Sequence, residues 1–388
     1  MADHSRRSLF QLAGAAALLR GQIALAQQSA PPPTKQGRGT NSRGPGGRGG
    51  LDEPFPALER HSTVAVISGA ERRKNVHDAL VAIDKQILPG LKSKKFVVIK
   101  PNNVSTVNQL AATHVDALRG ILDYLAPRFK GPVTIAEASA GQTHEGFENF
   151  KYPPLLKEYA KQKVSLVDLN EDARFETIAL LDGDMHPIPC RIARMLVDPD
   201  AFVISSAMLK THNTVIATLS VKNMVLGAPL HQAPKDTARW NEKRKFHFGV
   251  RQTHYNMLLT AQKLQPHWGV ALIDGFEGME GNGPGSGTPV SSKIAIASTD
   301  FIAADRVGVE AMSINPDWLG YLKYSSALGL GQYDLSKIDV VGAKLADVKK
   351  PYRMHADIEL ELEWQGPMTE LPPQIGWLTP FSEYPPCA

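Results

Sequence analysis

The chain is poor in cysteine: its 388 residues include only Cys190 and Cys387. Two thiols cannot complete a four-cysteine zinc site or hold an iron–sulfur cluster. We therefore expect that this chain binds no iron–sulfur cluster of its own. Whether the two cysteines pair as a disulfide stays open, because pairing depends on how closely their Cα atoms approach.

Several motifs of common enzymes are also missing. The chain has no Gly-x-Ser-x-Gly elbow, no Walker phosphate loop and no His-Glu-x-x-His zinc pattern. These absences argue against an α/β-hydrolase, a P-loop nucleotide site and a zincin-type peptidase. No apolar run is long enough to span a bilayer, so we expect no stable membrane span.

The excess of positive charge is confined to the start of the chain. The sequence holds 43 Lys and Arg against 39 Asp and Glu, and its pI is about 8.9. Within residues 1–50, Asp3 is the single acid, against six arginines and one lysine. The rest of the chain is therefore slightly acidic, which argues against a nucleic-acid partner.

The first residues have the pattern of an export signal, predicted over residues 1–26. Ser5–Phe10 reads Ser-Arg-Arg-Ser-Leu-Phe, a twin-arginine motif, and Leu12–Leu19 is weakly apolar. Ala24–Ala26 fits a cleavage site of small residues. We expect recognition by the twin-arginine translocase of a bacterium, with the mature protein periplasmic or secreted. Residues 27–55, rich in Pro, Gly and Arg, are predicted to form a disordered linker.

Residues 56–346 are predicted to form an α/β domain. Short continuous apolar runs alternate with helical stretches, which is typical of a mostly parallel sheet with helices on both faces. One domain or two packed lobes would both fit this length. Residues 347–388 are predicted to hold a C-terminal strand and a Pro-rich tail. The strand is expected at 357–364, where apolar and acidic residues alternate as in an antiparallel or edge strand.

The densest group of chemically active residues follows a predicted buried strand at 201–206. Ligands of α/β proteins bind at such strand ends. Lysine can serve as a base when burial removes its proton, and histidine transfers protons near neutral pH. The candidate catalytic residues are His212, Lys222 and Lys210. Thr211 and Asn223, in the same stretch, are candidate substrate-binding residues.

Two other segments are expected to contribute to the same site. Lys100 and Asn102 follow the predicted strand at 96–99, and a lysine there offers a charge to a carboxylate or phosphate. The glycine-rich loop at 274–287, which includes Gly283, allows a ligand to approach the backbone closely. The polar segment 229–252 is interpreted as a long excursion over the site.

A divalent cation is also compatible with the sequence. Asp274, Glu280 and Asp305 offer hard oxygen ligands of the kind that Mg²⁺ and Ca²⁺ prefer. Their spacing matches no established metal motif, so the metal and any other cofactor are left unidentified. Asp300 is interpreted as the N-cap of the helix that contains Asp305.

Several of these segments together resemble the uncharacterised family known as domain of unknown function 362. The resemblance covers about residues 64–342 and lies in Lys100-Pro101-Asn102, Thr113-His114, Leu209-Lys210-Thr211-His212, Val221-Lys222-Asn223-Met224, Asp274-Gly275, Gly281-Asn282-Gly283-Pro284 and Ala303-Ala304-Asp305. It implies a shared site rather than a known reaction. Some members are fused to ferredoxin-type iron–sulfur modules, whose cysteines are missing here.

The leading hypothesis is an exported enzyme that acts on a small anionic substrate by Lys/His acid–base chemistry. Lys100, Lys210 and Lys222 would hold the anion, and His212 would transfer a proton. Removal of a proton next to a carboxylate suits such a site, with metal assistance as an option. The alternatives are a non-catalytic periplasmic binding or accessory protein and a partner in iron–sulfur redox chemistry.

Overall fold

The computed structural model describes residues 56–172, 174–237 and 241–365. The predicted signal peptide, the linker up to residue 55 and the tail from residue 366 lie outside the described residues. Among the helices that are described, none combines the length and the apolar character needed to cross a membrane.

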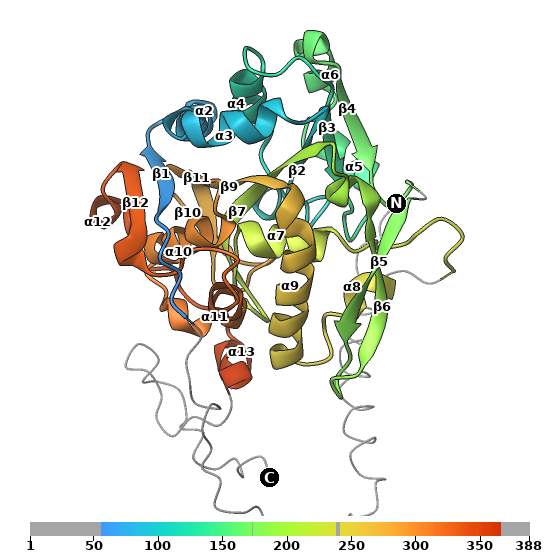
Figure 1. The fold of residues 1–388 in the computed structure, drawn as a ribbon, viewed down its shortest axis with the longest axis vertical. Coiled ribbons are helices and arrows are strands. Elements are labelled where there is room, and N and C mark those ends of the chain that lie inside the picture. Colours follow the sequence, from blue (N-terminus) through green and yellow to red (C-terminus); the bar gives the residue numbers. More distant parts are fainter. Residues whose placement is uncertain (1–55, 173, 238–240, 366–388) are drawn as a thin grey trace, which may run out of the picture. The chain divides into compact units, whose positions relative to one another are not determined.

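A sheet of ten strands forms the centre of the described part of the chain (Figure 1). Its main path, in spatial order, is β12 (Ile338–Gly342), β1 (Ser62–Ser68), β11 (Ile294–Ser298), β9 (Trp268–Glu280), β7 (Ala201–His212), β2 (Phe96–Lys100), β3 (Val133–Glu137) and β4 (Val164–Asp168). Two short strands extend it: β10 (Thr288–Val290) pairs with β9, and β8 (Ile216–Thr218) pairs with β7.

Most neighbouring strands are parallel, which confirms the predicted sheet. On the main path only β11 is antiparallel, and it is so to both of its neighbours, β1 and β9. The five strands from β9 to β4 all run in one direction, so their carboxyl ends meet at one edge. Strands from β1 near the start to β12 near the end of the described chain share this one sheet.

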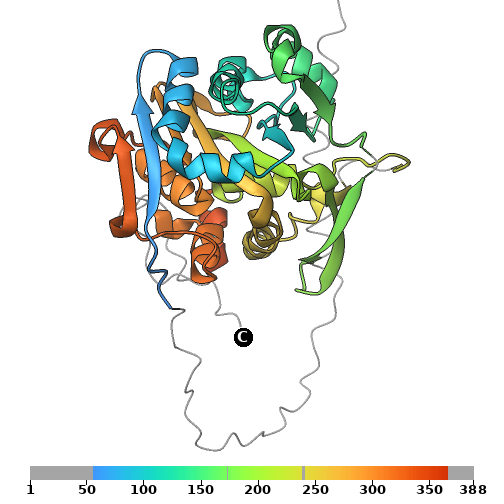
Figure 2. The same cartoon turned by 45° about the horizontal axis from the view of Figure 1, so that its top comes forward.

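Helices cover both faces of the sheet (Figures 1 and 2). One face carries α2 (Arg72–Ala82), α3 (Asp84–Lys92) and α4 (Val115–Leu125), and the other carries α7 (Ser220–Gly227), α9 (Val250–Leu264), α10 (Phe301–Ala311) and α11 (Gly320–Ala327). The shorter helices are α5 (Thr143–Asn149), α6 (Pro154–Glu158), α8 (Asn241–Arg244), α12 (Leu345–Val348) and α13 (Ile358–Leu362).

The two helical layers explain why the strands have continuous apolar sequences. In β2, Val97 and Ile99 belong to the core under α2, α3 and α4, whereas Val98 belongs to the core under α7, α9, α10 and α11. All three side chains are fully buried. Burying each such side chain contributes about 1.5–3 kcal/mol, so a central strand needs apolar residues on both faces.

A hairpin of β5 (Phe175–Leu181) and β6 (Pro187–Ala193) forms a separate two-stranded sheet that was not predicted. Two prolines at Pro187 and Pro189 break the strand pattern in the sequence. The hairpin is accommodated because proline is tolerated in edge strands, where a missing N–H breaks no ladder.

The predicted C-terminal strand at 357–364 is wrong. This segment forms α13 and then a 3-10 turn at Glu363–Gln365. Ile358 and Leu362, four residues apart, are buried on one helical face, while Leu360 is exposed. The carboxylate of Glu361 is buried too and accepts a hydrogen bond of 2.7 Å from the Ile216 amide. A tertiary contact has therefore overridden the two-residue alternation.

The start of α7 is held by a carboxylate from α10. Asp305 is fully buried and accepts hydrogen bonds of 2.8 and 2.9 Å from the amides of Ser220 and Val221. These amides lie at the helix start and have no partner within the helix. Burial raises the pKa of Asp305 to about 8, although the two hydrogen bonds oppose the shift. This contact ties α7 to α10 beneath the sheet.

Candidate functional site

A cavity lies where the chain changes direction along the carboxyl edge of the sheet. From β2 the chain continues to β3 and β4 on one side, whereas β7 lies on the other side of β2. The connections that leave β2 and β7 therefore diverge, and a crevice forms between them. The sequence predicted a site at this edge but not the strand order that opens it.

The cavity has a volume of about 210 Å³, and lysine, histidine and asparagine dominate its wall. Its polar and charged lining residues are Lys100, Asn102, Asn103, Glu137, His212, Asn213, Thr214, Lys222, Asn223, Lys243 and His247. Five residues that were predicted to form the site, Lys100, Asn102, His212, Lys222 and Asn223, thus meet around one cavity.

A buried ion pair between Lys100 and Glu137 forms the floor of this arrangement. Lys100 Nζ lies 2.7 Å from Glu137 Oε1, and both side chains are at most 3% exposed. The same ammonium donates to the Pro101 carbonyl at 2.7 Å and to Asn223 Oδ1 at 3.2 Å. Because an ammonium has three protons, Lys100 has no further donor for a ligand. Its role is to supply charge and to position its partners.

Glu137 was not predicted as a site residue. Its Oε2 accepts a hydrogen bond of 2.9 Å from the Asn103 amide, and its Oε1 accepts one of 2.8 Å from the Ala138 amide. The signal in the sequence that could have revealed Glu137 was its position: it is a carboxylate at the end of β3, the strand beside β2, which ends at Lys100. Using that signal required knowing that β2 and β3 are neighbours.

Asn223 connects α7 to this floor. Its Nδ2 donates to the Lys100 carbonyl at 3.2 Å and to Ser205 Oγ at 3.0 Å. Its Oδ1 also accepts a hydrogen bond of 3.2 Å from Asn102 Nδ2. The buried Asn102 Oδ1 and Asn103 Nδ2 have no partner among the described residues. The wall of the cavity therefore holds an acceptor and a donor group that the described residues do not satisfy.

Lys222 lies one residue before Asn223 and has a different environment. Its side chain is 6% exposed, and no acceptor or carboxylate pairs with its ammonium in the described part of the chain. Burial, and next the charges of Lys243 and Lys100, lower the pKa of Lys222 to about 7. A large fraction of this side chain is therefore the neutral amine at neutral pH.

Lys243, which was not predicted, reaches the cavity from α8. This helix lies in the 229–252 segment interpreted as an excursion over the site, of which residues 238–240 are outside the description. Lys243 Nζ donates to the Leu226 carbonyl at 2.7 Å. Burial lowers the pKa of Lys243 to about 7, although Glu137 opposes the shift. Two of its protons stay available to a ligand.

His212 is a neutral hydrogen-bond donor in this environment. Burial, and next the charge of Lys222, hold the pKa of His212 well below its ordinary value. Its Nδ1 accepts a hydrogen bond of 3.1 Å from the Thr214 amide. That bond assigns the proton of the neutral ring to Nε2. Burial also lowers the pKa of His247, the second histidine of the wall.

Three other predicted residues support the site from outside its lining. Lys210 Nζ donates to the Ala111 carbonyl at 3.1 Å, and Thr211 Oγ1 donates to the Gly281 carbonyl at 2.8 Å. Gly283 packs against the carbonyl of Thr211 so closely that no Cβ would fit there. Its neighbour Pro284 lines the cavity. These residues attach the glycine-rich loop to β7.

The predicted metal ligands Asp274, Glu280 and Asp305 do not come together. Asp274 is buried and lies 3.0 Å from the guanidinium of Arg72. Glu280 faces Arg353 at 3.7 Å, and Asp305 holds the start of α7 as described above. Each carboxylate is used by a different element, so this trio forms no shared metal site.

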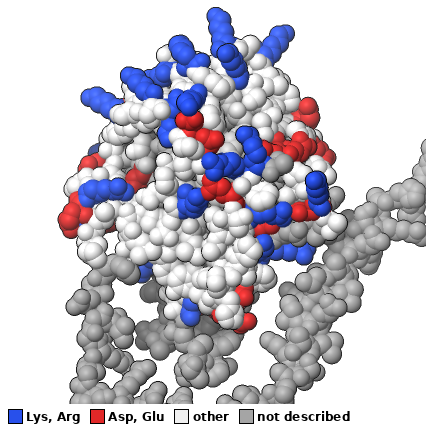
Figure 3. Space-filling model, turned by 45° about the vertical axis from the view of Figure 1, so that its right-hand side comes forward, with Lys and Arg blue, Asp and Glu red and all other residues white. Residues whose placement is uncertain are grey.

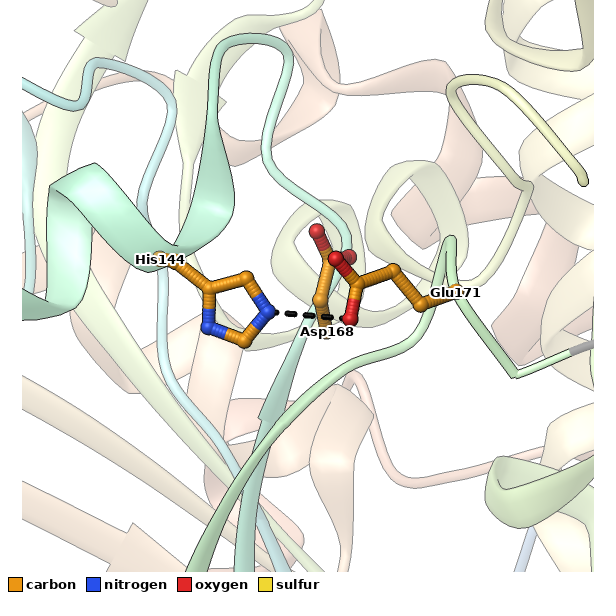
Figure 4. Close-up of side chains that lie close together, drawn as sticks. All are labelled: His144, Asp168 and Glu171. Atoms are coloured by element: carbon orange, nitrogen blue, oxygen red, sulfur yellow. Dashed lines mark hydrogen bonds and ion pairs between the residues drawn. The ribbon is translucent and has the colours of Figure 1, made fainter.

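Another group of ligand atoms lies at the end of the neighbouring strand β4. Figure 4 shows the side chains of His144, Asp168 and Glu171 turned toward one another. His144 Nε2 lies 3.0 Å from Glu171 Oε2, and Asp168 Oδ1 accepts a hydrogen bond from the Asn170 amide. His144 and Glu171 are exposed. These atoms could hold a cation, but the protein contacts already account for their arrangement.

The cations of the cavity are distinct from those on the surface. Figure 3 shows Lys and Arg side chains gathered at the top of one face, while lower down they mix with acids. Lys100, Lys222 and Lys243 are at most 7% exposed. These buried charges interact more strongly with other charges than surface charges do, because water screens them less.

Gly227→Ala should break the ion pair without changing any charged residue. A Cβ at position 227 would lie 2.5 Å from Lys100 Nζ and would displace the ammonium from Glu137. Separating a buried pair costs about 3–5 kcal/mol, and we expect a loss of that order in urea unfolding. Gly308→Ala, in α10, is the matched control: it meets only side-chain ends at 3.3–3.4 Å, so we expect a change of about 1 kcal/mol or less. Equal stability of the two variants would contradict this role of Gly227.

Comparisons with known proteins place the chain in a family. It is 28% identical over 147 residues to thylakoid-associated protein sll1697 of Synechocystis, a match covering 36% of this chain and 41% of that protein. A crystal structure of a Thermotoga maritima protein matches with a TM-score of 0.40 and 10% identity, over 66% of this chain and 59% of that one. The chain thus covers less than two thirds of both proteins. Residues 97–310, more than half of the chain, match one family, and this segment contains all of the described residues that line the cavity. The protein belongs to that family, described as domain of unknown function DUF362.

Proposed function

We propose that this protein is an enzyme that acts on a small anionic substrate by lysine-dependent acid–base chemistry, removing a proton next to a carboxylate. The observation that carries the proposal is Lys222, a buried amine that has no partner among the described residues and lies in a cavity whose other charges are mostly positive.

The charge of the cavity favours an anion. Among the described residues, its lining contains the amino groups of Lys100, Lys222 and Lys243 and one carboxylate, that of Glu137. Glu137 is already paired with Lys100. A buried cation without a counter-charge is costly and tends to lose its proton instead. A carboxylate beside Lys222 and Lys243 would supply that counter-charge and favour their protonated forms.

The contacts in the cavity suggest a role for each group. Lys243 keeps two protons for a substrate carboxylate, and Lys100 adds its charge from behind. In the complexes in which Lys222 is in its neutral form, its amine can accept a proton from carbon. A well-placed general base contributes about 10²–10⁴-fold in rate, and it works best when its pKa is near the operating pH.

His212 has a different role from the one predicted for it. Its Nδ1 is occupied by the Thr214 amide, and its pKa lies well below its ordinary value. The ring therefore accepts a proton poorly at neutral pH. Its Nε2–H is suited to donate a hydrogen bond to a substrate oxygen, where it would stabilise negative charge that develops in the reaction.

The alternative is a non-catalytic binding or accessory protein that uses the same cavity. Binding requires only the positive charge of the wall, whereas proton removal also requires an amine that gains and loses a proton. Anion affinity alone therefore does not separate the two functions. Exchange of carbon-bound hydrogen separates them, because a binding protein leaves those bonds intact.

Affinity for small carboxylates should fall as the pH rises above 7. The pKa values of Lys222 and Lys243 are lowered to about 7, so above that pH an anion must bind together with protons. Affinity should then drop by up to about tenfold per pH unit for each proton taken up. Titration calorimetry with acetate, lactate, pyruvate and malonate at about pH 6.5 and about pH 8.5 measures this fall in affinity.

Lys222→Met should weaken this binding and reduce its pH dependence. Lys85→Met is the matched control, because Lys85 is exposed on α3 and should leave affinity unchanged. Affinity that is independent of pH, or an equal loss in both variants, would argue against the cavity as the anion site.

The full-length protein should exchange hydrogen next to the carboxylate or carbonyl of its substrates. Proton NMR of the same four compounds in D₂O should show a loss of signal that depends on the protein. Lys222→Met should slow this exchange by about 10²-fold or more, in line with the loss of a general base. His212→Gln keeps an N–H donor and should retain most of the exchange. Binding without exchange in any of the compounds would favour the non-catalytic alternative, and loss of exchange only in His212→Gln would return the proton transfer to His212.

We also propose that the protein is exported through the twin-arginine translocase to the periplasm or beyond. The motif at Ser5–Phe10 and the small residues at Ala24–Ala26 support this. Replacing Arg6 and Arg7 together by Lys should keep the full-length chain in the cytoplasm, whereas Arg20→Lys should be exported and shortened like the wild type. Immunoblots of periplasmic and cytoplasmic fractions measure this, and equal export of both variants would contradict the proposal.

A further inference from the structure

We propose that Lys222 forms an imine with the carbonyl carbon of a small oxo-carboxylate held in the cavity. This inference rests on the proposed function and deepens it, because it names the class of substrate and the way in which its C–H bond is made acidic.

The hydrogen bonds single out Lys222 among the four buried lysines around the site. Lys100 uses all three protons, Lys210 donates to the Ala111 carbonyl, and Lys243 donates to the Leu226 carbonyl. Within the described residues, Lys222 has no such acceptor. An amine must have a free lone pair to attack a carbonyl carbon, and only the neutral form has one. Of the four lysines, Lys222 has the surroundings that stabilise the charged ammonium form least.

The neighbouring cations strengthen this difference. Lys243 and Lys100 lie close enough to lower the pKa of Lys222, which burial has already lowered, and the result is about 7. An ordinary lysine with a pKa near 10.4 is neutral in only about 0.04% of molecules at pH 7, whereas a pKa of about 7 makes roughly half of them neutral. This is the arrangement in which desolvation and an adjacent cation activate a lysine nucleophile.

The wall of the cavity fits an oxo-carboxylate better than a simple carboxylate. Lys243 can hold the carboxylate, and the Nε2–H of His212 can donate to the carbonyl oxygen, which becomes negative during attack. Leu226 lies four residues after Lys222 on α7 and also lines the cavity, so an apolar surface is next to the amine. A volume of about 210 Å³ corresponds to roughly seven water-sized groups, which suits a short-chain oxo acid.

The chemistry balances without an external oxidant or reductant. The Lys222 nitrogen attacks the carbonyl carbon, a C–N bond forms, and one amine proton moves to the oxygen to give a carbinolamine. Loss of this hydroxyl with a proton releases one water and leaves the imine, which is protonated to an iminium. The iminium withdraws electrons from the adjacent C–H bond. Lys243 stays protonated while it holds the carboxylate, so the water released in imine formation is the group that can accept that proton.

Reductive trapping tests this inference directly. The full-length protein is incubated with pyruvate or 2-oxobutyrate and sodium borohydride, and its intact mass and peptide map are measured. We expect one reduced oxo-acid unit for each chain, attached to Lys222, and competition by lactate, which has a carboxylate but no carbonyl. The competition experiment needs no variant and so does not depend on any substitution being tolerated.

The variants should separate the buried lysines from one another. Lys222→Met and Lys222→Arg should each reduce trapping by at least about tenfold, and Lys85→Met should leave it unchanged. Labelling spread over exposed lysines, or persisting in both Lys222 variants, would overturn the inference. Pyruvate that binds and exchanges hydrogen without trapping at Lys222 would also overturn it, but would leave the proposed acid–base function intact. Failure of all four carboxylates to bind would instead reject the proposed function.

Discussion

The buried ion pair between Lys100 and Glu137 is the interaction on which the site depends. Two charges removed from water lose several kcal/mol of solvation each, and such a pair is tolerated only when its remaining donors and acceptors are satisfied. Here Lys100 uses every proton, and Glu137 accepts two backbone N–H groups as well. The pair joins the ends of β2 and β3, and Asn223 connects it to α7. Beside this frame, Lys222 has no partner in the part of the chain that the structure describes.

Neighbouring groups, rather than residue type, decide what each lysine of the cavity can do. Lys100 is neutralised by Glu137 and saturated with acceptors. Lys243 has one carbonyl acceptor and keeps protons for a ligand. Lys222 has no acceptor in the described structure, so burial and adjacent positive charge act on it without opposition from a hydrogen bond. Three identical side chains are thereby suited to positioning, anion binding and proton or carbonyl chemistry.

The sequence predicted the residues that follow β2 and β7 better than it predicted their partners on other elements. Lys100, Asn102, His212, Lys222 and Asn223 were predicted because they follow apolar strands, and parallel strands end at a common edge. Their partners on other elements were missed. Glu137 ends an ordinary strand, and Lys243 lies in a polar segment that has no periodic pattern. Nothing local distinguishes either residue from a solvated charge.

The errors have the same origin. Asp274, Glu280 and Asp305 have the right chemistry for a metal, but each carboxylate is used by a separate contact. The alternation at 357–364 fits a strand, yet the burial of Glu361 against the Ile216 amide favours a helix. In both cases a residue far away in the sequence supplied the partner of the carboxylate. This tertiary contact determined the local structure, because local propensity was the weaker effect.

The sequence by itself determined the parallel α/β architecture, because continuous apolar runs separated by helices can be buried only between two helical layers. It also determined that lysines and a histidine lie at the carboxyl edge. Only the tertiary structure decided that β7 lies beside β2 and that the diverging connections open a cavity there. It also decided that Lys100 is paired while Lys222 has no partner among the residues that the structure describes. Pairing depends on distances between residues more than 30 positions apart, and such distances are set by packing rather than by local sequence.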